Sequence, residues 1–250
     1  MRVTILGTGD SPGTPVIGCH CRTCENARKN GWERLRFSIL VQNEGKNILI
    51  DTSPDMRRQL LRAGVDKVDA VIWTHAHYDH FAGFGDFYRV QSGVNVYSSG
   101  EVLEDVGRFM YFMKYRERQV EPYEPFKLFG VEITLVDVTH PPMRRAHGVV
   151  LRYGGSKVVI TGDTNPKIPE RSVDEMLRPD LLLVDAIAPE GYRLRKHMNA
   201  GDALSFARKV NARKTLFVHV GHFYQPSSKY PLAKDFESFE FRGVSLEDFI

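Results

Sequence analysis

Long hydrophobic runs are absent from this 250-residue sequence. A membrane-spanning helix needs about 18 apolar residues in a row, and no segment approaches that length, so no membrane partner is expected. The segment at the start, MRVTILGTGDSPG, lacks the apolar core of a signal peptide, and we therefore expect a cytoplasmic protein. An excess of one charge is also absent, because 34 basic residues oppose 31 acidic ones and leave a net charge of +3. No long-range field therefore favours nucleic acid as the partner.

Cysteine is scarce, and its three copies all lie in one short segment, as Cys19, Cys21 and Cys24. A disulfide framework would spread its cysteines along the chain, whereas such a cluster is typical of a metal site. A structural zinc ion needs four sulfur or nitrogen ligands. Because the chain has no fourth cysteine, a histidine must complete the site. His20 lies between two ligands and is sterically awkward, so we expect His222.

The apolar pattern predicts one α/β domain over residues 1–250. Apolar runs around short turns predict strand hairpins, and segments with helical spacing separate further strands. Hairpins interleaved with amphipathic helices favour two sheets with the helices outside them. The prediction rests on hairpins at 37–50 and 149–161, helices at 55–63 and 200–210, and strands at 70–73, 131–139, 181–184 and 215–220.

Residues 100–118 form a segment rich in aromatic and basic side chains, GEVLEDVGRFMYFMKYRER. Its spacing predicts a helical insertion whose Phe/Met face packs on the core. A lid over the site and a homodimer surface are the alternatives for this segment.

A dense metal-ligand motif, THAHYDH, follows the strand predicted at 70–73. His75 and His77 are two residues apart at a strand end and can project to one side, while Asp79 and His80 fall on the first turn of a helix. Imidazole and carboxylate ligands hold Zn, Mn or Fe. Four ligands cannot complete two coordination spheres, so more distant residues must contribute.

The candidates for these additional ligands each end an apolar run: His140 after LVDVT, Asp163 after VVITG and His219 after TLFV. A carboxylate such as Asp163 can bridge two cations about 3.5–4 Å apart. A lone histidine after a strand is usually structural, but the motif together with three ordered downstream ligands predicts a two-metal site.

This ligand order resembles that of the metallo-β-lactamase superfamily over nearly the whole chain. The resemblance implies a four-layer αβ/βα sandwich and a hydrolase that uses a hydroxide held between two divalent metals, Zn or Mn. It also implies that Asp51, in ILIDTS, supports the ligands by accepting the second N–H of a histidine. Asp79 is expected in addition to accept a proton from the attacking water. The implied ligands are His75, His77 and His140 for one metal, Asp79, His80 and His219 for the other, and Asp163 as the bridge.

The early segment LGTGDSPGTPVIGCHCRTC and the late residues 219–222, HVGH, resemble a narrower group, the PhnP phosphodiesterases. That resemblance implies a structural zinc on the cysteine cluster and His222. It also implies a small cyclic or linear phosphodiester as substrate, such as a phosphoribosyl cyclic phosphate. The group has an active-site histidine before a late helix, which His197 in RKHMN matches. His197 would bind the phosphate or protonate the leaving group.

Three alternatives remain. A tRNase Z-like nuclease that processes RNA 3′ ends shares the two-metal site, but an exosite arm is not apparent and that group lacks the cysteine cluster. A PqqB-like accessory protein shares the cluster, but usually has degraded catalytic ligands. A non-catalytic metal-binding or nucleic-acid-binding module is suggested by two basic patches, Arg144-Arg145 and Arg193-Leu194-Arg195-Lys196. The near-neutral net charge makes nucleic acid the less favoured partner.

Overall fold

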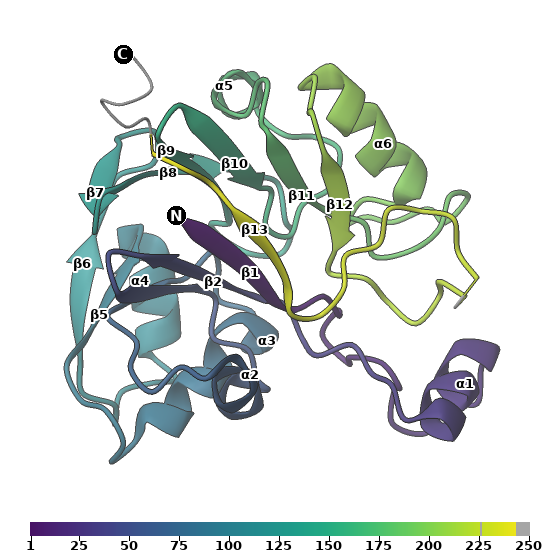
Figure 1. The fold of residues 1–250 in the computed structure, drawn as a ribbon, viewed down its shortest axis with the longest axis horizontal. Helices are drawn as coiled ribbons and strands as arrows, with labels where there is room; N and C mark the ends of the chain where they lie inside the picture. The colour runs from purple at the N-terminus through teal and green to yellow at the C-terminus, as the bar shows by residue number, and fades with distance from the viewer. Residues whose placement is uncertain (226, 244–250) are drawn as a thin grey trace.

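Two β-sheets pack face to face, and helices cover their outer faces (Figure 1). The structure is a computed structural model that describes residues 1–225 and 227–243. In spatial order, the first sheet contains β13 (Glu237–Glu240), β1 (Arg2–Gly7), β2 (Ser38–Asn43), β3 (Lys46–Ile50), β4 (Ala70–Ile72), β5 (Val94–Ser98) and β6 (Tyr115–Gln119). The second contains β12 (Thr215–Val218), β11 (Leu181–Asp185), β10 (Ser156–Ile160), β9 (His147–Tyr153), β8 (Val131–Asp137) and β7 (Phe126–Leu128).

The helices divide between the two sheets. On the side of the first sheet lie α2 (Met56–Ala63), α3 (Tyr78–Phe81), the 3₁₀ helix η1 (Ala82–Phe87) and α4 (Gly100–Gly107), and on the side of the second lie α5 (Glu170–Glu175) and α6 (Ala200–Lys209) (Figure 1). Helix α1 (Arg22–Asn30) projects away from the sandwich. Helix α6 begins at an Asn199 N-cap, and Asp202, three residues later in the sequence, completes a capping box.

Three apolar layers hold this arrangement together. Ile5 of β1 and Leu135 of β8 belong to the layer between the two sheets. Phe206 of α6 belongs to the layer outside the second sheet, and Leu103 of α4 to the layer outside the first. Central strands are buried on both faces, which explains why they are nearly continuous apolar runs in the sequence. The predicted four-layer α/β sandwich is confirmed.

The predicted helical insertion over residues 100–118 is wrong in its extent. The helix, α4, ends at Gly107, and residues 115–119 form β6, which pairs in parallel with β5. The side chain of Tyr115 makes edge contacts with Trp73 and Phe84, with ring centroids 5.6 and 5.4 Å apart. Pairing with β5 and this aromatic packing override the local helical pattern. Helix α4 lies in the outer layer and β6 at the edge of the first sheet, so the segment is part of the sandwich.

Within the described residues, no helix combines the length and apolar character needed to cross a bilayer.

A close backbone contact joins the end of β3 to the helices that follow β4. Gly83 donates its N–H to the carbonyl oxygen of Thr52 at 3.0 Å, and Thr52 donates its own N–H to the carbonyl oxygen of His80 at 2.8 Å. A Cβ atom on Gly83 would overlap the carbonyl oxygen of Ser53 and lie 2.9 Å from the Met56 Cβ. Only glycine fits at this approach.

We therefore expect Gly83→Ala to lower the free energy of unfolding by about 1–3 kcal/mol or more, because overpacking forces the backbone to shift. Gly85→Ala is the matched control, because no heavy atom lies within 4 Å of its Cβ position. Urea denaturation followed by circular dichroism measures both variants. If the Gly83→Ala and Gly85→Ala variants had equal free energies of unfolding, the close backbone contact at Gly83 would not restrict the residue at that position.

Candidate functional site

The predicted ligands lie together where strands of both sheets end. His75 follows β4, His140 follows β8, Asp163 follows β10 and His219 follows β12. Strands β10, β11 and β12 are parallel, and β8 runs in the same direction as β10 because both are antiparallel to β9. The carboxyl ends of these strands therefore meet at one edge of the second sheet. An isolated bridge between His75 and Ala146 joins the first sheet to this edge.

A first group of donor atoms comes from His75, His77, His140 and Asp163, whose ligating atoms lie within 4.8 Å of one another. His77 Nδ1 is 3.0 Å from His75 Nε2 and 2.9 Å from His140 Nε2. A tetrahedral cation bound at about 2.0–2.1 Å would hold its nitrogen ligands about 3.3 Å apart. The spacing of this group is therefore close to what one cation requires.

A second group comes from Asp79, His80 and His219, and Asp163 connects it to the first. Asp79 Oδ2 is 3.4 Å from both His80 Nε2 and His219 Nε2. Asp163 Oδ2 is 3.3 Å from these same two nitrogens, and 3.7 Å from His75 Nε2 and His140 Nε2. One oxygen of Asp163 thus faces both groups. The structure brings all seven predicted residues together, while their role as ligands stays a prediction.

Asp51 orients two of these histidines. Its carboxylate lies 2.6 Å from His80 Nδ1 and accepts the N–H and hydroxyl of Thr74 at 2.8 and 2.7 Å. Thr74 Oγ1 in turn lies 3.0 Å from His75 Nδ1. When His80 donates its Nδ1 proton to Asp51, its Nε2 lone pair faces Asp79 and Asp163, which is the tautomer that a metal ligand needs. His140 is held in the same tautomer, because its Nδ1 lies 3.0 Å from the carbonyl oxygen of Lys196.

The electrostatics of the cluster keep its carboxylates ionised. Burial alone would raise the pKa values of Asp163 and Asp79, but the adjacent His219 and His80 hold both well below the usual range. Burial lowers the pKa of His140 to about 4, so this imidazole is neutral at physiological pH. Burial would also lower the pKa of His219, but Asp163 and the hydrogen bond with Asp79 raise it to about 9. A cation that binds in place of the proton on His219 would therefore contact carboxylates that are already ionised.

His197 lies beside both groups of donors. Its ring is stacked on His219 with centroids 5.0 Å apart, and makes an edge contact with His140 at 4.8 Å. Its Nδ1 is 2.8 Å from Asp185 Oδ2. Burial lowers the pKa of His197, but the Asp185 carboxylate outweighs it and raises the pKa above its ordinary value. The imidazole is therefore held in one orientation and favours the protonated state.

Asp185 was not among the residues predicted from the sequence. It ends β11 and is fully buried, and its Oδ2 also accepts the N–H of Thr164, the residue after Asp163, at 2.9 Å. A carboxylate at the end of the apolar run LLLVD is the same signal that identified Asp163. That signal was available, but the pairing with His197 depends on the path of the loop between β11 and α6.

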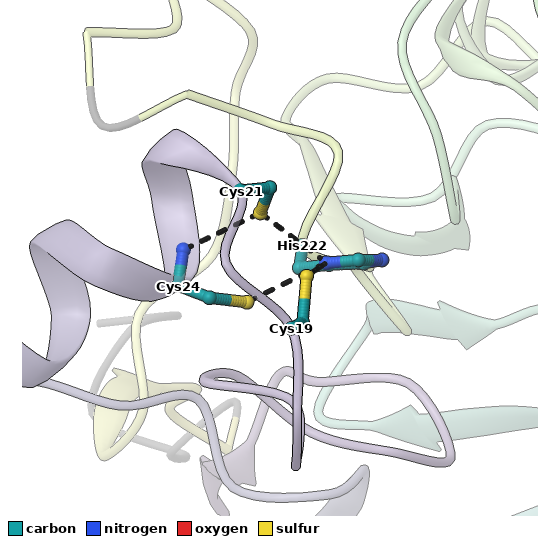
Figure 2. A group of neighbouring side chains, drawn as sticks. All are labelled: Cys19, Cys21, Cys24 and His222. Carbon is teal, nitrogen blue, oxygen red and sulfur yellow. Dashed lines mark hydrogen bonds between the residues drawn. The ribbon is translucent and has the colours of Figure 1, made fainter.

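The three cysteines surround His222 (Figure 2), while their role as zinc ligands stays a prediction. His222 Nδ1 is 3.3 Å from Cys19 Sγ and 3.5 Å from the Sγ atoms of Cys21 and Cys24. In a tetrahedral zinc site with Zn–S about 2.3 Å and Zn–N about 2.0–2.1 Å, sulfur and nitrogen ligands are about 3.5 Å apart. The four residues therefore fit a closed structural zinc site, and we name them the Cys3His cluster.

The surroundings of the Cys3His cluster favour a thiolate at Cys21, whereas burial raises the pKa of the Cys24 thiol to about 11. Cys21 is the N-cap of α1, where its sulfur accepts the N–H of Cys24 at 3.5 Å. Burial raises the pKa of Cys21, but this and the neighbouring hydrogen bonds lower it to about 6. His20 takes no part, because its side chain is 83% exposed and lies 3.6 Å from Glu25.

Comparison with known proteins agrees with this geometry. The family model described as "Beta-lactamase superfamily domain" matches residues 46–220. The chain belongs to the metallo-β-lactamase superfamily of hydrolases. The match contains every residue of the two donor groups and stops short of the Cys3His cluster, which lies outside it on both sides.

Among solved structures, a diphosphatase of the PhnP family is 30% identical and has a TM-score of 0.83, with 96% of this chain and 98% of that one covered. The predicted resemblance to the PhnP group is thereby confirmed. Zinc-bound PqqB from Methylobacterium extorquens is 21% identical, with a TM-score of 0.82 and coverage of 96% and 100%, and shows the shared fold.

Among curated proteins, the octanoyltransferase of Porphyromonas gingivalis is 30% identical over 235 residues, which are 89% of this chain and 46% of that protein. The coenzyme PQQ synthesis protein B of Bradyrhizobium diazoefficiens is 32% identical over 146 residues, or 50% and 47% of the two chains. The chain spans about half the length of these curated relatives.

The Cys3His cluster gives a direct test of the structural zinc. We expect Cys21→Ser and His222→Ala to lose one equivalent of zinc and to unfold at lower temperature, because zinc binding contributes to folding. His20→Ala is the matched control and should keep both zinc and stability, since His20 faces solvent. Elemental analysis of the purified protein together with thermal denaturation measures these effects. Zinc loss in His20→Ala, or a disulfide within the cluster, would contradict the assignment.

Proposed function

We propose that this protein is a metal-dependent phosphodiesterase that hydrolyses small cyclic or linear phosphodiesters, such as phosphoribosyl cyclic phosphates. The observation that carries the proposal is the placement of Asp163 Oδ2 between two groups of histidines, with the Asp185-paired His197 beside them. The 30% identity to a PhnP-family diphosphatase over nearly the full length of both chains supports the same class of chemistry.

The donor atoms fit two divalent cations, for which Zn and Mn are the candidates. His80 Nε2 is buried and has no hydrogen-bond partner among the described residues, although it points toward two carboxylates. Buried polar atoms normally have a hydrogen-bond partner. A buried imidazole nitrogen without one is expected where that nitrogen binds a cation. When bound, such cations lower the pKa of a water and neutralise charge on a phosphodiester.

The protein side chains then position the reacting groups and supply protons. Asp163 and Asp79 remain ionised, so they can hold cations, and the lowered pKa of Asp79 makes its carboxylate a weak acceptor for a proton from water. His197 donates its Nδ1 proton to Asp185, and its Nε2 carries the proton that can stabilise the phosphate or reach the leaving oxygen. Asp51 and the Lys196 carbonyl keep the histidine rings from turning.

A diphosphate ester is the second candidate substrate. The similarity of this chain to a PhnP-family diphosphatase supports this candidate. The phosphoanhydride of a diphosphate ester presents the same oxygens to the site as a phosphodiester. A tRNase Z-like activity remains the third alternative, since the human short-form tRNase Z shares the fold with a TM-score of 0.74 at 19% identity.

A substrate panel tests the proposal. Under one set of metal conditions, it compares ribose 1,2-cyclic phosphate, a 2′,3′-cyclic nucleotide, ADP-ribose and a 3′-extended tRNA, with and without a chelator. We expect chelator-sensitive hydrolysis of the small diesters to monoesters. Efficient tRNA trimming without activity on the small esters would favour the tRNase Z alternative, and exclusive hydrolysis of ADP-ribose would favour the diphosphatase.

The Asp185–His197 pair predicts a pH effect of definite sign. Asp185 raises the pKa of His197, so the protonated imidazole, and the activity that needs it, persists until the pH rises through that raised value. Asp185→Asn removes the negative charge that raises the pKa of His197. The basic limb of the pH profile of kcat should therefore move to lower pH. His197→Ala should remove that limb and lower kcat by about 10²–10⁴-fold on an alkyl diester.

The measurement for this pair is the pH profile of kcat, with the His197 ring titration followed by NMR. Asp174→Asn, an exposed carboxylate on α5, is the control and should leave the profile in place. A basic limb that stays unmoved in Asp185→Asn would contradict the assignment of His197.

A further inference from the structure

Strand β6 lies at the open edge of the first sheet (Figure 1). On one side it pairs in parallel with β5, in the register from Val94 with Tyr115 to Ser98 with Gln119. Within residues 1–225 and 227–243, no backbone segment pairs with its other side. Every residue of β6 after Tyr115 is exposed. An edge strand of this kind presents unpaired N–H and C=O groups, with which another extended chain can pair.

One face of β6 carries two guanidinium groups. Side chains alternate along a strand, so Arg116 and Arg118 project to the same face. Arg118 Nε donates to the side-chain oxygen of Asn95 at 3.0 Å. The guanidinium carbon of Arg116 lies 3.6 Å from the position that a Cβ of Gly93 would take. Both arginines therefore lie against neutral groups in or next to β5, and these contacts leave their charge in place.

The basic pair Arg144-Arg145, which the sequence suggested as a binding patch, is in a different state. Both arginines lie within 3.1 Å of a carboxylate on α4, so their charge is neutralised inside the protein. For Arg116 and Arg118, by contrast, the described part of the chain provides no carboxylate within ion-pair distance. The charge of the β6 pair is therefore available to a partner.

The opposite face of β6 borders an open cavity of about 680 Å³. The strand and the segment after α4 contribute mainly aromatic and methionine side chains to it, among them Met110, Tyr111, Met113 and Tyr115. The side chain of Tyr111 is aromatic and yet 85% exposed. Methionine side chains adapt to apolar groups of different shape. The cavity therefore suits an apolar side chain from a segment that lies along β6.

We propose that β6 is a docking strand for an extended peptide segment of a partner protein, in which acidic and apolar residues alternate. The segment adds a strand to the first sheet through main-chain hydrogen bonds with β6. Its acidic side chains lie on the face of Arg116 and Arg118, and its apolar side chains lie over the cavity beside Tyr111. Recognition by strand addition combines main-chain affinity with side-chain specificity in this way. This inference is independent of the proposed phosphodiesterase function.

Other occupants account for fewer of these features. If the first sheets of two copies continued into each other with like faces aligned, Arg116 of one copy would lie opposite an arginine of the other, and like charges in that position are destabilising. A single-stranded nucleic acid could contact the guanidinium groups, but it has no main-chain amides to pair with the strand edge. The net charge of +3 also gives little long-range attraction to a polyanion.

The test measures binding of a fluorescein-labelled peptide, Gly-Glu-Leu-Glu-Leu-Glu-Leu-Gly, to the full-length protein by fluorescence anisotropy. We expect saturable binding that Arg116→Glu and Arg118→Glu each weaken about three- to tenfold, because an opposite-charge pair across two strands becomes a like-charge pair. The same two variants should bind more tightly a peptide with lysine in place of glutamate. Tyr111→Ala should weaken binding of both peptides, because it removes part of the cavity wall.

Two controls separate the backbone contribution from the charges. One pair of peptides is N-methylated either at the glutamates or at the leucines, and only the peptide whose blocked amides face β6 should lose binding. Lys29→Glu reverses an exposed charge on α1, the helix that projects from the sandwich, and should leave the affinity unchanged. Thermal denaturation checks that every variant is folded.

Each remaining outcome overturns the proposal. The docking strand is contradicted if the wild type does not bind the peptide, if both N-methylated peptides bind as well as the parent, or if the arginine variants keep full affinity. Binding of oligouridine through Arg116 and Arg118 without binding of the peptide would assign the face to nucleic acid. A dimer in sedimentation velocity that excludes the peptide and dissociates in Arg116→Glu would assign the edge to a second copy.

Discussion

The buried carboxylate of Asp163 is the point on which the architecture of the site depends. Four histidine nitrogens, two from each donor group, lie within 3.3–3.7 Å of a single oxygen. A buried anion is costly unless opposite charge surrounds it. The strands of both sheets must therefore end at a common edge, and the close approach at Gly83 holds the Asp79–His80 turn against the end of β3. Packing of the sandwich and charge balance in the site thus impose the same geometry.

Residues 219–222 join the second donor group to the Cys3His cluster. His219 belongs to the second donor group and His222 to the Cys3His cluster. Between them, Val220 donates its N–H to the carbonyl oxygen of Thr8 at 2.7 Å, and Gly221 donates to that of Ile187 at 2.9 Å. A Cβ on Gly221 would lie 2.8 Å from that Ile187 oxygen. A structural zinc ion at one end of this segment would therefore help to hold a catalytic ligand at the other end.

The loop between β11 and α6 combines rigidity with exposure. Its backbone carbonyls accept hydrogen bonds from His140 and Asn165, and Asp185 below it holds His197. Side chains placed on such a clamped loop can meet a substrate at little entropic cost. His197 and the cationic Lys196 are consecutive, so positioning one also positions the other.

Much of the site could be predicted from the sequence because its signals are local. Strand ends marked by histidine or aspartate, the HxHxDH spacing and the Asn199/Asp202 cap each lie within a few residues. The tertiary structure alone decided which distant groups meet. Residues 115–119 became a strand through pairing with β5, Arg144 and Arg145 were neutralised by α4 and β8, and Asp185 met His197 through the course of a loop. Local patterns encode conformational preference and burial, whereas contacts between remote segments depend on how the two sheets pack and where each chain segment returns.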